Sequence, residues 1–441
     1  MTPRTFTIPL TAFTCALLLL PVASNAADPA TIDWSKVPVK TVKLFYPGQG
    51  SYQWLLSPEH KKGDKQVAQG KSCVSCHEGD EADIGNKLVK GGPLEATPVP
   101  GKPGTIDLAV QAAYDDKNAF FRFQWKTQNN VPGDTYPFYR FDGKEWKGYG
   151  QPVLDKEVRE GKQPGIYEDR LNLMIDDGKV PNFAAQGCWL TCHDGMRDMK
   201  NFATKEQVAA NPLLGAQKRS DVRKYLTVTR NGETAPWDKT KTADEIAKLK
   251  ADGVFVDLIQ WRAHRSNPVG MADDGYVLEY RLFDAGKNPF ASNMNSETKQ
   301  PRYMFDAKKT GAKALTKDEV GKPGKPKFLI KDDTAVPFDP KAGWKEGDML
   351  PQYYTSRADA SGSAADNANA KGEWKDGKWT VVWARPLNLA NPDDKALKAG
   401  GTYSVGFAVH DGNITTRGHH VSFPISLGFG AKADIQAVKL N

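Results

Sequence analysis

Several features that would assign the chain to a common class of protein are scarce in its sequence. Its 441 residues include only five cysteines and seven histidines, and 60 lysines and arginines against 53 aspartates and glutamates leave a formal charge of only +7. No run of basic residues is long enough to follow a nucleic-acid backbone, so nucleic acid is not an expected partner. After residue 26 no stretch is apolar enough to span a bilayer, and no integral membrane segment is expected.

The one long apolar run, over residues 8–22, has the features of a secretory signal peptide. It follows Arg4 and leads to Ser24-Asn25-Ala26, a small-residue cleavage site. A membrane anchor needs about 20 apolar residues, whereas this run contains threonines and ends in a cleavage site. We therefore expect residues 1–26 to be removed on export and the mature chain to work in the periplasm.

Four cysteines remain in the chain after that cleavage. They form two close pairs, and each pair is followed directly by a histidine. The two motifs are Cys73-Val74-Ser75-Cys76-His77 and Cys188-Trp189-Leu190-Thr191-Cys192-His193. In a c-type cytochrome two thiols bond to one edge of the haem, and the next residue places its imidazole on the iron. The repeated order predicts two covalently bound c-type haems, with His77 and His193 as iron ligands.

Two other uses of the four thiols have to be weighed against haem attachment. Close cysteine pairs in an exported protein commonly form disulfides, and four thiols can also bind zinc. The two-residue gap of the first motif is the standard spacing for haem, whereas the three-residue gap of the second is a rarer variant. The adjacent histidines favour haem at both motifs, because neither a disulfide nor a zinc site requires them.

Methionine is absent between Met1 and Met174, which restricts the sixth ligand of the first haem. A local ligand can only be His60, and the alternative for this residue is an exposed loop histidine beside two lysines. His264 is the long-range candidate, with a buried structural histidine as its alternative.

Most of the remaining chain has the two-residue periodicity of β structure. Alternating segments over 108–114 and 119–125 predict a hairpin, and strands are also expected over 254–262, 276–283, 402–410 and 419–427. Asp142-Gly143 and Asp376-Gly377, each between aromatic alternating runs, predict tight type I′ turns.

Helical patterns are few by comparison. Thr242 and Glu245 form a capping box ahead of a short helix over 243–252. The expected fold is mainly β: an antiparallel β sandwich with short helices and long loop insertions over 101–441, preceded by an N-terminal haem-binding segment over 27–100.

Three groups of residues also resemble a known family. They are Val110–Tyr114 with Phe121–Trp125, Asp257–Arg262 with Asp273–Tyr276, and Tyr403–Gly412 with His420–Ser422. In this order they resemble the haem-binding domain shared by the γ subunit of ethylbenzene dehydrogenase, related dimethyl sulfide and selenate oxidoreductase subunits, and periplasmic c-type cytochromes. The resemblance spans residues 105–435 and implies a β sandwich that clasps one haem at its end.

The chain departs from the γ subunits of that family at the haem ligands. Those subunits hold a non-covalent haem between a methionine and a lysine, and the corresponding regions here contain the 188–193 motif and His419-His420. The second haem is therefore expected to be covalent, with two histidine ligands. On a strand only one of His419 and His420 can reach the iron. His420 is favoured because it shares a face with Ser422, opposite the apolar Val421, but a pocket on the core face would select His419.

Two classes of function follow from these features. The first is a dihaem cytochrome that transfers single electrons between periplasmic redox proteins. The alternative is the electron-transfer, γ-like subunit of a molybdenum oxidoreductase, or a haem enzyme with one open iron. Electron transfer is favoured over catalysis for two reasons. Enough histidines remain to provide a sixth ligand for both irons, and no separate nucleophile or acid-base group stands out.

Overall fold

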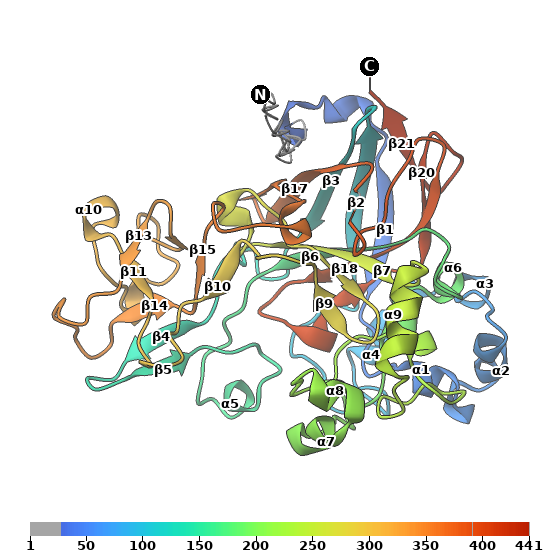
Figure 1. The fold of residues 1–441 in the computed structure, drawn as a ribbon, viewed down its shortest axis with the longest axis horizontal. Helices are drawn as coiled ribbons and strands as arrows, with labels where there is room; N and C mark the ends of the chain where they lie inside the picture. Colours follow the sequence, from blue (N-terminus) through green and yellow to red (C-terminus); the bar gives the residue numbers. More distant parts are fainter. Residues whose placement is uncertain (1–27, 390, 441) are drawn as a thin grey trace, which may run out of the picture.

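A large, mainly antiparallel β sheet forms the body of the protein (Figure 1). The computed structural model describes residues 28–389 and 391–440, so the expected signal peptide over 1–26 lies outside the described residues. In sheet order the strands are β16 (Asn369–Lys375), β17 (Lys378–Pro386), β3 (Asn118–Lys126), β2 (Thr105–Tyr114), β1 (Lys40–Phe45), β19 (His420–Val421), β18 (Thr402–His410), β6 (Arg170–Asp176), β7 (Val256–Arg262), β8 (Gly275–Val277) and β9 (Arg281–Phe283). Two further strands, β20 (Ile425–Phe429) and β21 (Ile435–Lys439), pair beside β18 and β2.

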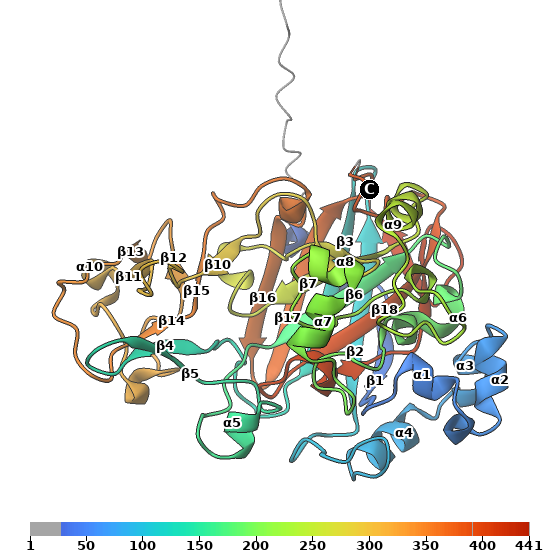
Figure 2. The same cartoon turned by 60° about the horizontal axis from the view of Figure 1, so that its bottom comes forward.

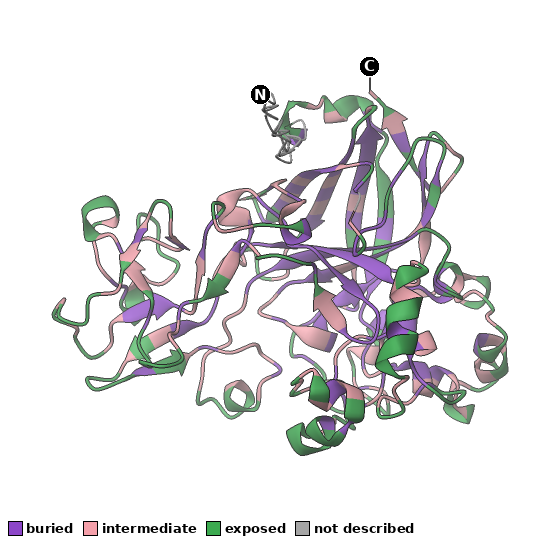
Figure 3. Ribbon diagram, viewed as in Figure 1, coloured by how far each residue is buried: buried purple, intermediate pink, exposed green. Residues whose placement is uncertain are grey.

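The sheet folds back on itself, so that two layers enclose one apolar core. Phe123 of β3 meets Phe407 of β18 with ring centres 6.0 Å apart, and Trp125 of β3 meets Trp261 of β7 at the same distance. Alternate side chains of both layers point into this core. Figure 3 shows that most of the central strands are buried. The predicted fold class, an antiparallel β sandwich with short helices, is confirmed.

Local turn chemistry explains which predicted hairpins form. β2 and β3 pair from Ala109 opposite Gln124 to Tyr114 opposite Ala119, as predicted. Asp376 and Gly377 both have positive φ, 51° and 75°, and close the expected type I′ turn between β16 and β17.

The prediction of a type I′ turn at Asp142-Gly143 is wrong. β4 (Phe138–Phe141) and β5 (Trp146–Tyr149) are joined by four residues. The Asp142 carboxylate accepts hydrogen bonds from the backbone N–H groups of Lys144 and Glu145, at 2.9 and 2.8 Å, and so stabilises a wider turn.

Two segments predicted as single strands are each divided. The segment 276–283 forms two short antiparallel strands instead of one. The chain reverses where the Leu278 N–H donates to the Tyr280 carbonyl, so that β8 pairs with β9. The segment 419–427 forms β19 and β20, which are separated by Pro424; proline has no N–H to continue a ladder.

Helices and a side lobe make up the rest of the described chain. The helix α9 (Ala243–Ala251) begins at the capping box of Thr242 and Glu245, as predicted. Other short helices outside the N-terminal segment are α5 (Lys156–Arg159), α6 (Phe183–Gln186), α7 (Lys205–Ala210) and α8 (Pro212–Ala216). The side lobe, on the left in Figure 1, is built from β4, β5, β10 (Phe290–Ser292), β11 (Tyr303–Phe305), β12 (Leu329–Ile330), β13 (Ala335–Pro337), β14 (Met349–Pro351), β15 (Tyr353–Thr355) and α10 (Ala307–Thr310). It has an apolar core of its own.

The N-terminal segment 27–100 contributes a strand to the sandwich as well as helices. β1 pairs along its whole length with β2, and Phe45 at its end pairs with Val421 of β19. The helices α1 (Tyr52–Leu55), α2 (Gly63–Ala68), α3 (Val74–His77) and α4 (Glu81–Leu88) then gather at one end of the sheet (Figure 2). No helix among the described residues is long and apolar enough to cross a membrane.

Candidate haem sites

The first cysteine motif forms a single helical turn at the end of the sandwich. Cys73 precedes α3, and the backbone N–H of His77 donates to the Cys73 carbonyl at 3.0 Å, which closes the turn. Cys76 is exposed and Cys73 is half-buried. The Cys73 N–H donates to the carbonyl of Ala185 at 3.0 Å, so the turn is anchored three residues before the second motif.

The ring of His60 is a near neighbour of the ring of His77. The ring centres are 6.3 Å apart and the ring planes differ by 21°. With metal–imidazole bonds of about 2 Å and about 1.2 Å from Nε2 to the ring centre, two imidazoles on opposite sides of one ion have centres about 6.4 Å apart. The separation of the two ring centres is therefore compatible with one ion bound between the two imidazoles.

Neighbouring groups hold the Nδ1 atom of each of these two rings. His60 Nδ1 lies 3.0 Å from the Leu55 carbonyl oxygen, and His77 Nδ1 lies 3.3 Å from a carboxylate oxygen of Asp80. Histidines that bind metals are typically oriented in this way, by a carbonyl or carboxylate on the second nitrogen. The Nε2 atoms are thereby left for a metal ion.

The second cysteine motif lines a cavity of about 510 Å³. The thiols of Cys188 and Cys192 lie on its wall, and burial raises the pKa of Cys188 to about 12. All four cysteines among the described residues are free thiols, so neither close pair forms the alternative disulfide. The volume lies within the range of about 300–1,000 Å³ that is usual for ligand and cofactor pockets.

Basic side chains dominate the wall of this cavity. No acidic residue of the described chain lines it, whereas seven arginines and one lysine do: Arg170, Arg197, Arg223, Arg262, Arg265, Arg281, Arg417 and Lys224. All seven arginines form ion pairs with acidic residues outside the cavity wall, among them Arg262 with Asp273 at 2.6 Å and Arg265 with Glu168 at 2.7 Å. Guanidinium groups pair with carboxylates through two parallel hydrogen bonds, so the wall suits a planar ligand that carries carboxylates, as haem does.

The cavity lies on the side of His419 rather than of His420. His419 lines it and His420 does not, although the Nδ1 atoms of both residues lack a hydrogen-bond partner among the described residues. His420 points away, with its Nε2 2.8 Å from the Pro103 carbonyl oxygen. The pocket is on the core face of the strand, which moves our preference for the ligand from His420 to His419.

His410 is a cavity residue that the sequence reasoning missed. It ends β18 and stacks on His419, with ring centres 4.7 Å apart and planes within 9°. That separation is too short for the two rings to bind one ion from opposite sides, so they would not be the two histidine ligands of a single haem iron. A signal was present, because Gly406, Ala408 and His410 alternate along the strand and all line the cavity, and the first two leave room for a ligand.

His193 is turned away from the cavity. Its ring stacks on Tyr225 with centres 3.6 Å apart, and its Nε2 lies 3.0 and 2.9 Å from the carbonyl oxygens of Leu190 and Tyr225. Complete burial lowers the pKa of this imidazole to about 3, so the ring is neutral and Nε2 carries its proton. To bind a metal through Nε2, the ring must leave both carbonyls.

His264, the long-range candidate for the first haem, lies between the sandwich and the side lobe. Its Nδ1 is 2.9 Å from the Asp134 carbonyl oxygen, and its ring contacts Tyr136 and Phe328. Its backbone N–H donates to the buried carboxylate of Glu168. His60, not His264, is the histidine beside the first motif.

A chain of aromatic rings connects the two motifs. Phe423 lies parallel to the His77 ring at 6.3 Å and packs on Phe45 at 4.8 Å. Phe45 in turn stacks on Trp189, inside the second motif, at 6.0 Å. The two candidate haem sites are therefore neighbours joined by packed side chains.

The sequence of this chain is similar to a known protein family and to two named proteins. The sequence pattern of the family described as ethylbenzene dehydrogenase matches residues 31–422. The chain belongs to the ethylbenzene dehydrogenase family. The match confirms the resemblance predicted from the sequence, and it begins at residue 31 rather than 105, so it spans the segment that contains the first cysteine motif.

Two relatives of this ethylbenzene dehydrogenase family member are named as cytochromes. Cytochrome c-552 of Stutzerimonas stutzeri is 26% identical over 417 residues, which cover 94% of this chain and 92% of that protein. Cytochrome c-551 of Rhodocyclus tenuis is 29% identical over 175 residues, which cover 40% of this chain and 60% of that protein.

Proposed function

We propose that this protein is a periplasmic dihaem c-type cytochrome that transfers single electrons between redox proteins. The observation that carries the proposal is the facing pair of His60 and His77 beside the thiols of Cys73 and Cys76. The names of the two relatives support a c-type cytochrome. Iron held in haem supplies the one-electron chemistry.

At the first site, each residue has a distinct role in the proposal. Cys73 and Cys76 would attach the haem, and His77 and His60 would bind its iron. The Leu55 carbonyl and the Asp80 carboxylate orient the two imidazoles through Nδ1. Because Cys76 is exposed, this site is the one placed to exchange electrons with a partner protein.

At the second site, Cys188 and Cys192 provide the attachment and the arginines bind the two propionates. His419 and His193 would bind the iron of this haem, and the ring of His193 would first have to leave the carbonyls of Leu190 and Tyr225. This requirement makes ligation by His193 the least preformed part of the site.

The experiment that tests the proposal is an intact mass of the exported protein after acid-acetone extraction, which removes non-covalent haem. We expect the polypeptide mass, starting at residue 27, plus two haems. Replacement of Cys73 and Cys76 by alanine should remove one haem, and replacement of Cys188 and Cys192 the other. One haem in the native protein contradicts the dihaem proposal, and none contradicts a c-type cytochrome.

The family match favours one second candidate, an electron-transfer subunit that docks on a molybdenum oxidoreductase. This candidate predicts a stable complex with a molybdenum protein when the chain is purified from its own cell, whereas a free cytochrome is recovered alone. Carbon monoxide binding by the reduced native protein would instead indicate an open iron and argue against both electron-transfer candidates.

A further inference from the structure

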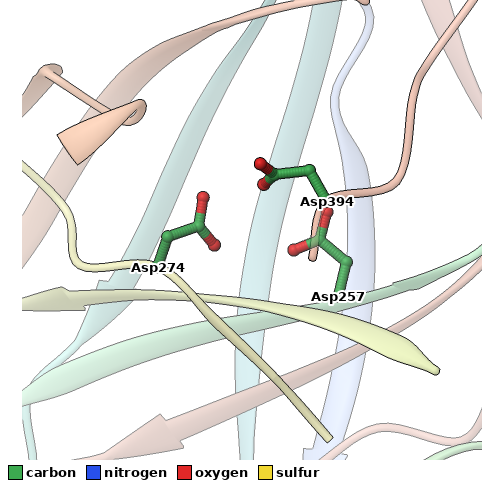
Figure 4. A group of neighbouring side chains, drawn as sticks. All are labelled: Asp257, Asp274 and Asp394. Carbon is green, nitrogen blue, oxygen red and sulfur yellow. The ribbon is translucent and has the colours of Figure 1, made fainter. Parts of the chain in front are cut away.

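Five aspartates that take no part in the haem sites meet at the edge of the sandwich. They are Asp257 on β7, Asp274 just before β8, Asp284 just after β9, and Asp393 and Asp394 in the connection from β17 to β18. All are at most 6% exposed. They form two groups of three that share Asp394, and within each group one oxygen from every carboxylate lies within 4.8 Å of the others. Figure 4 shows the three carboxylates of the first group directed toward one another.

The hydrogen bonds of these carboxylates follow a common pattern. In three of them one oxygen is anchored: Asp257 by Arg385 and the Lys395 N–H, Asp393 by the Ala285 N–H and Ser363, and Asp394 by Asn391. The second oxygen of each has no partner among the described residues. Outer groups that fix one oxygen and leave the other bare are the usual support of metal-binding carboxylates.

Two further side chains present buried oxygens without partners. Asp284 is 5% exposed, and neither of its oxygens has a hydrogen-bond partner, although its carboxylate belongs to the second group. Asn367 is completely buried; its amide donates to Asp274, while its carbonyl oxygen is unpaired. Leaving such oxygens buried and unsatisfied is costly unless a ligand occupies the space between them.

The charge of the cluster is also unbalanced. Against five carboxylates, one buried guanidinium, that of Arg385, makes an ion pair at 3.0 Å with Asp257. Carboxylates packed this closely repel one another, and a bound cation would offset that repulsion.

We propose that this aspartate cluster is a calcium site that fastens the β7–β9 edge of the sandwich to the β17–β18 connection. Calcium takes six to eight oxygen ligands, mainly carboxylate and amide carbonyl, whereas magnesium binds few carboxylates and keeps its waters. Each group of three carboxylates offers such oxygens, and the unpaired carbonyl oxygen of Asn367 belongs to the side chain that donates to Asp274. Asp394 also lines a surface groove with Asp177 and Lys250, which provides a path for the ion.

Calorimetric titration of CaCl₂ into the purified, haem-loaded full chain, stripped with a chelator, tests the site directly. We expect at least one ion per chain, bound with a Kd below about 10⁻⁴ M, and much weaker binding of Mg²⁺. Calcium should also raise the melting temperature. No binding up to about 1 mM Ca²⁺, or equal affinity for Mg²⁺, would overturn the assignment.

The double variant Asp284→Asn/Asp394→Asn separates a metal site from a shared-proton network. We expect its Kd for calcium to rise at least tenfold and the calcium-dependent rise in melting temperature to disappear. Without calcium it should melt no lower than the stripped native protein, because two repelling carboxylates are gone. Asp176→Asn, which alters a buried aspartate outside the cluster, is the control and should retain the calcium response. Unchanged calcium affinity in the double variant would refute the proposal.

Discussion

Replacing Arg417 by methionine should destabilise the protein by about 3 kcal/mol, the lower end of the cost of leaving a buried charge without its partner. Its guanidinium contacts the carboxylate of Glu95, which is completely buried. After the replacement Glu95 keeps hydrogen bonds from the Tyr46 hydroxyl and from the Thr97 N–H, the latter at 3.2 Å, so the carboxylate is not wholly unsatisfied. These two remaining donors are why we expect the lower value.

The double variant Arg417→Met/Glu95→Gln provides the control, because it leaves no buried charge at this position. We expect it to be more stable than Arg417→Met alone, although it has one more substitution. Urea denaturation followed by circular dichroism measures both free energies of unfolding. If the double variant is the less stable of the two, the cost of Arg417→Met does not come from the stranded carboxylate and the reasoning is refuted.

Three other predictions concern the haem sites and the core. His60→Ala should let the reduced protein bind one carbon monoxide per chain, where the native protein binds none; no binding would exclude His60 as a ligand. His419→Ala should alter the reduced-minus-oxidised spectrum and His420→Ala should not; the reverse result would restore His420 as ligand. Gly372→Ala should cost at least about 2 kcal/mol in urea denaturation, because a Cβ there would lie 2.1 Å from the buried ring of Trp261; an unchanged midpoint would contradict this.

Arg417 also links the two parts of the proposed cytochrome. It joins Glu95, at the end of the N-terminal segment, to the loop that carries His419, and it lines the cavity itself. Beside it, Thr416 and Arg417 both contact Asp198. Loosening this contact should therefore disturb the second haem site as well as the fold.

Sequence alone was enough for features that one short stretch of chain can build. A cysteine motif needs only a helical turn, so the positions of Cys73, Cys76 and His77 relative to one another follow from their spacing. The same holds for the turn at Asp376-Gly377, whose two positive φ angles suit those residue types. The alternating strands predicted the sandwich for the same reason, since side-chain period decides which face is apolar.

Tertiary structure decided everything that depends on how distant segments meet. Which of His419 and His420 faces the cavity depends on which side of β19 is enclosed, and the strand's own alternation could not tell the two faces apart. His410 reaches the same cavity only through the register of β18. The aspartate cluster joins residues from 257 to 394, and its members are separated in sequence by strands whose pairing no local pattern specifies. Local geometry is encoded residue by residue, whereas a cavity or a cluster exists only once the sheet has closed.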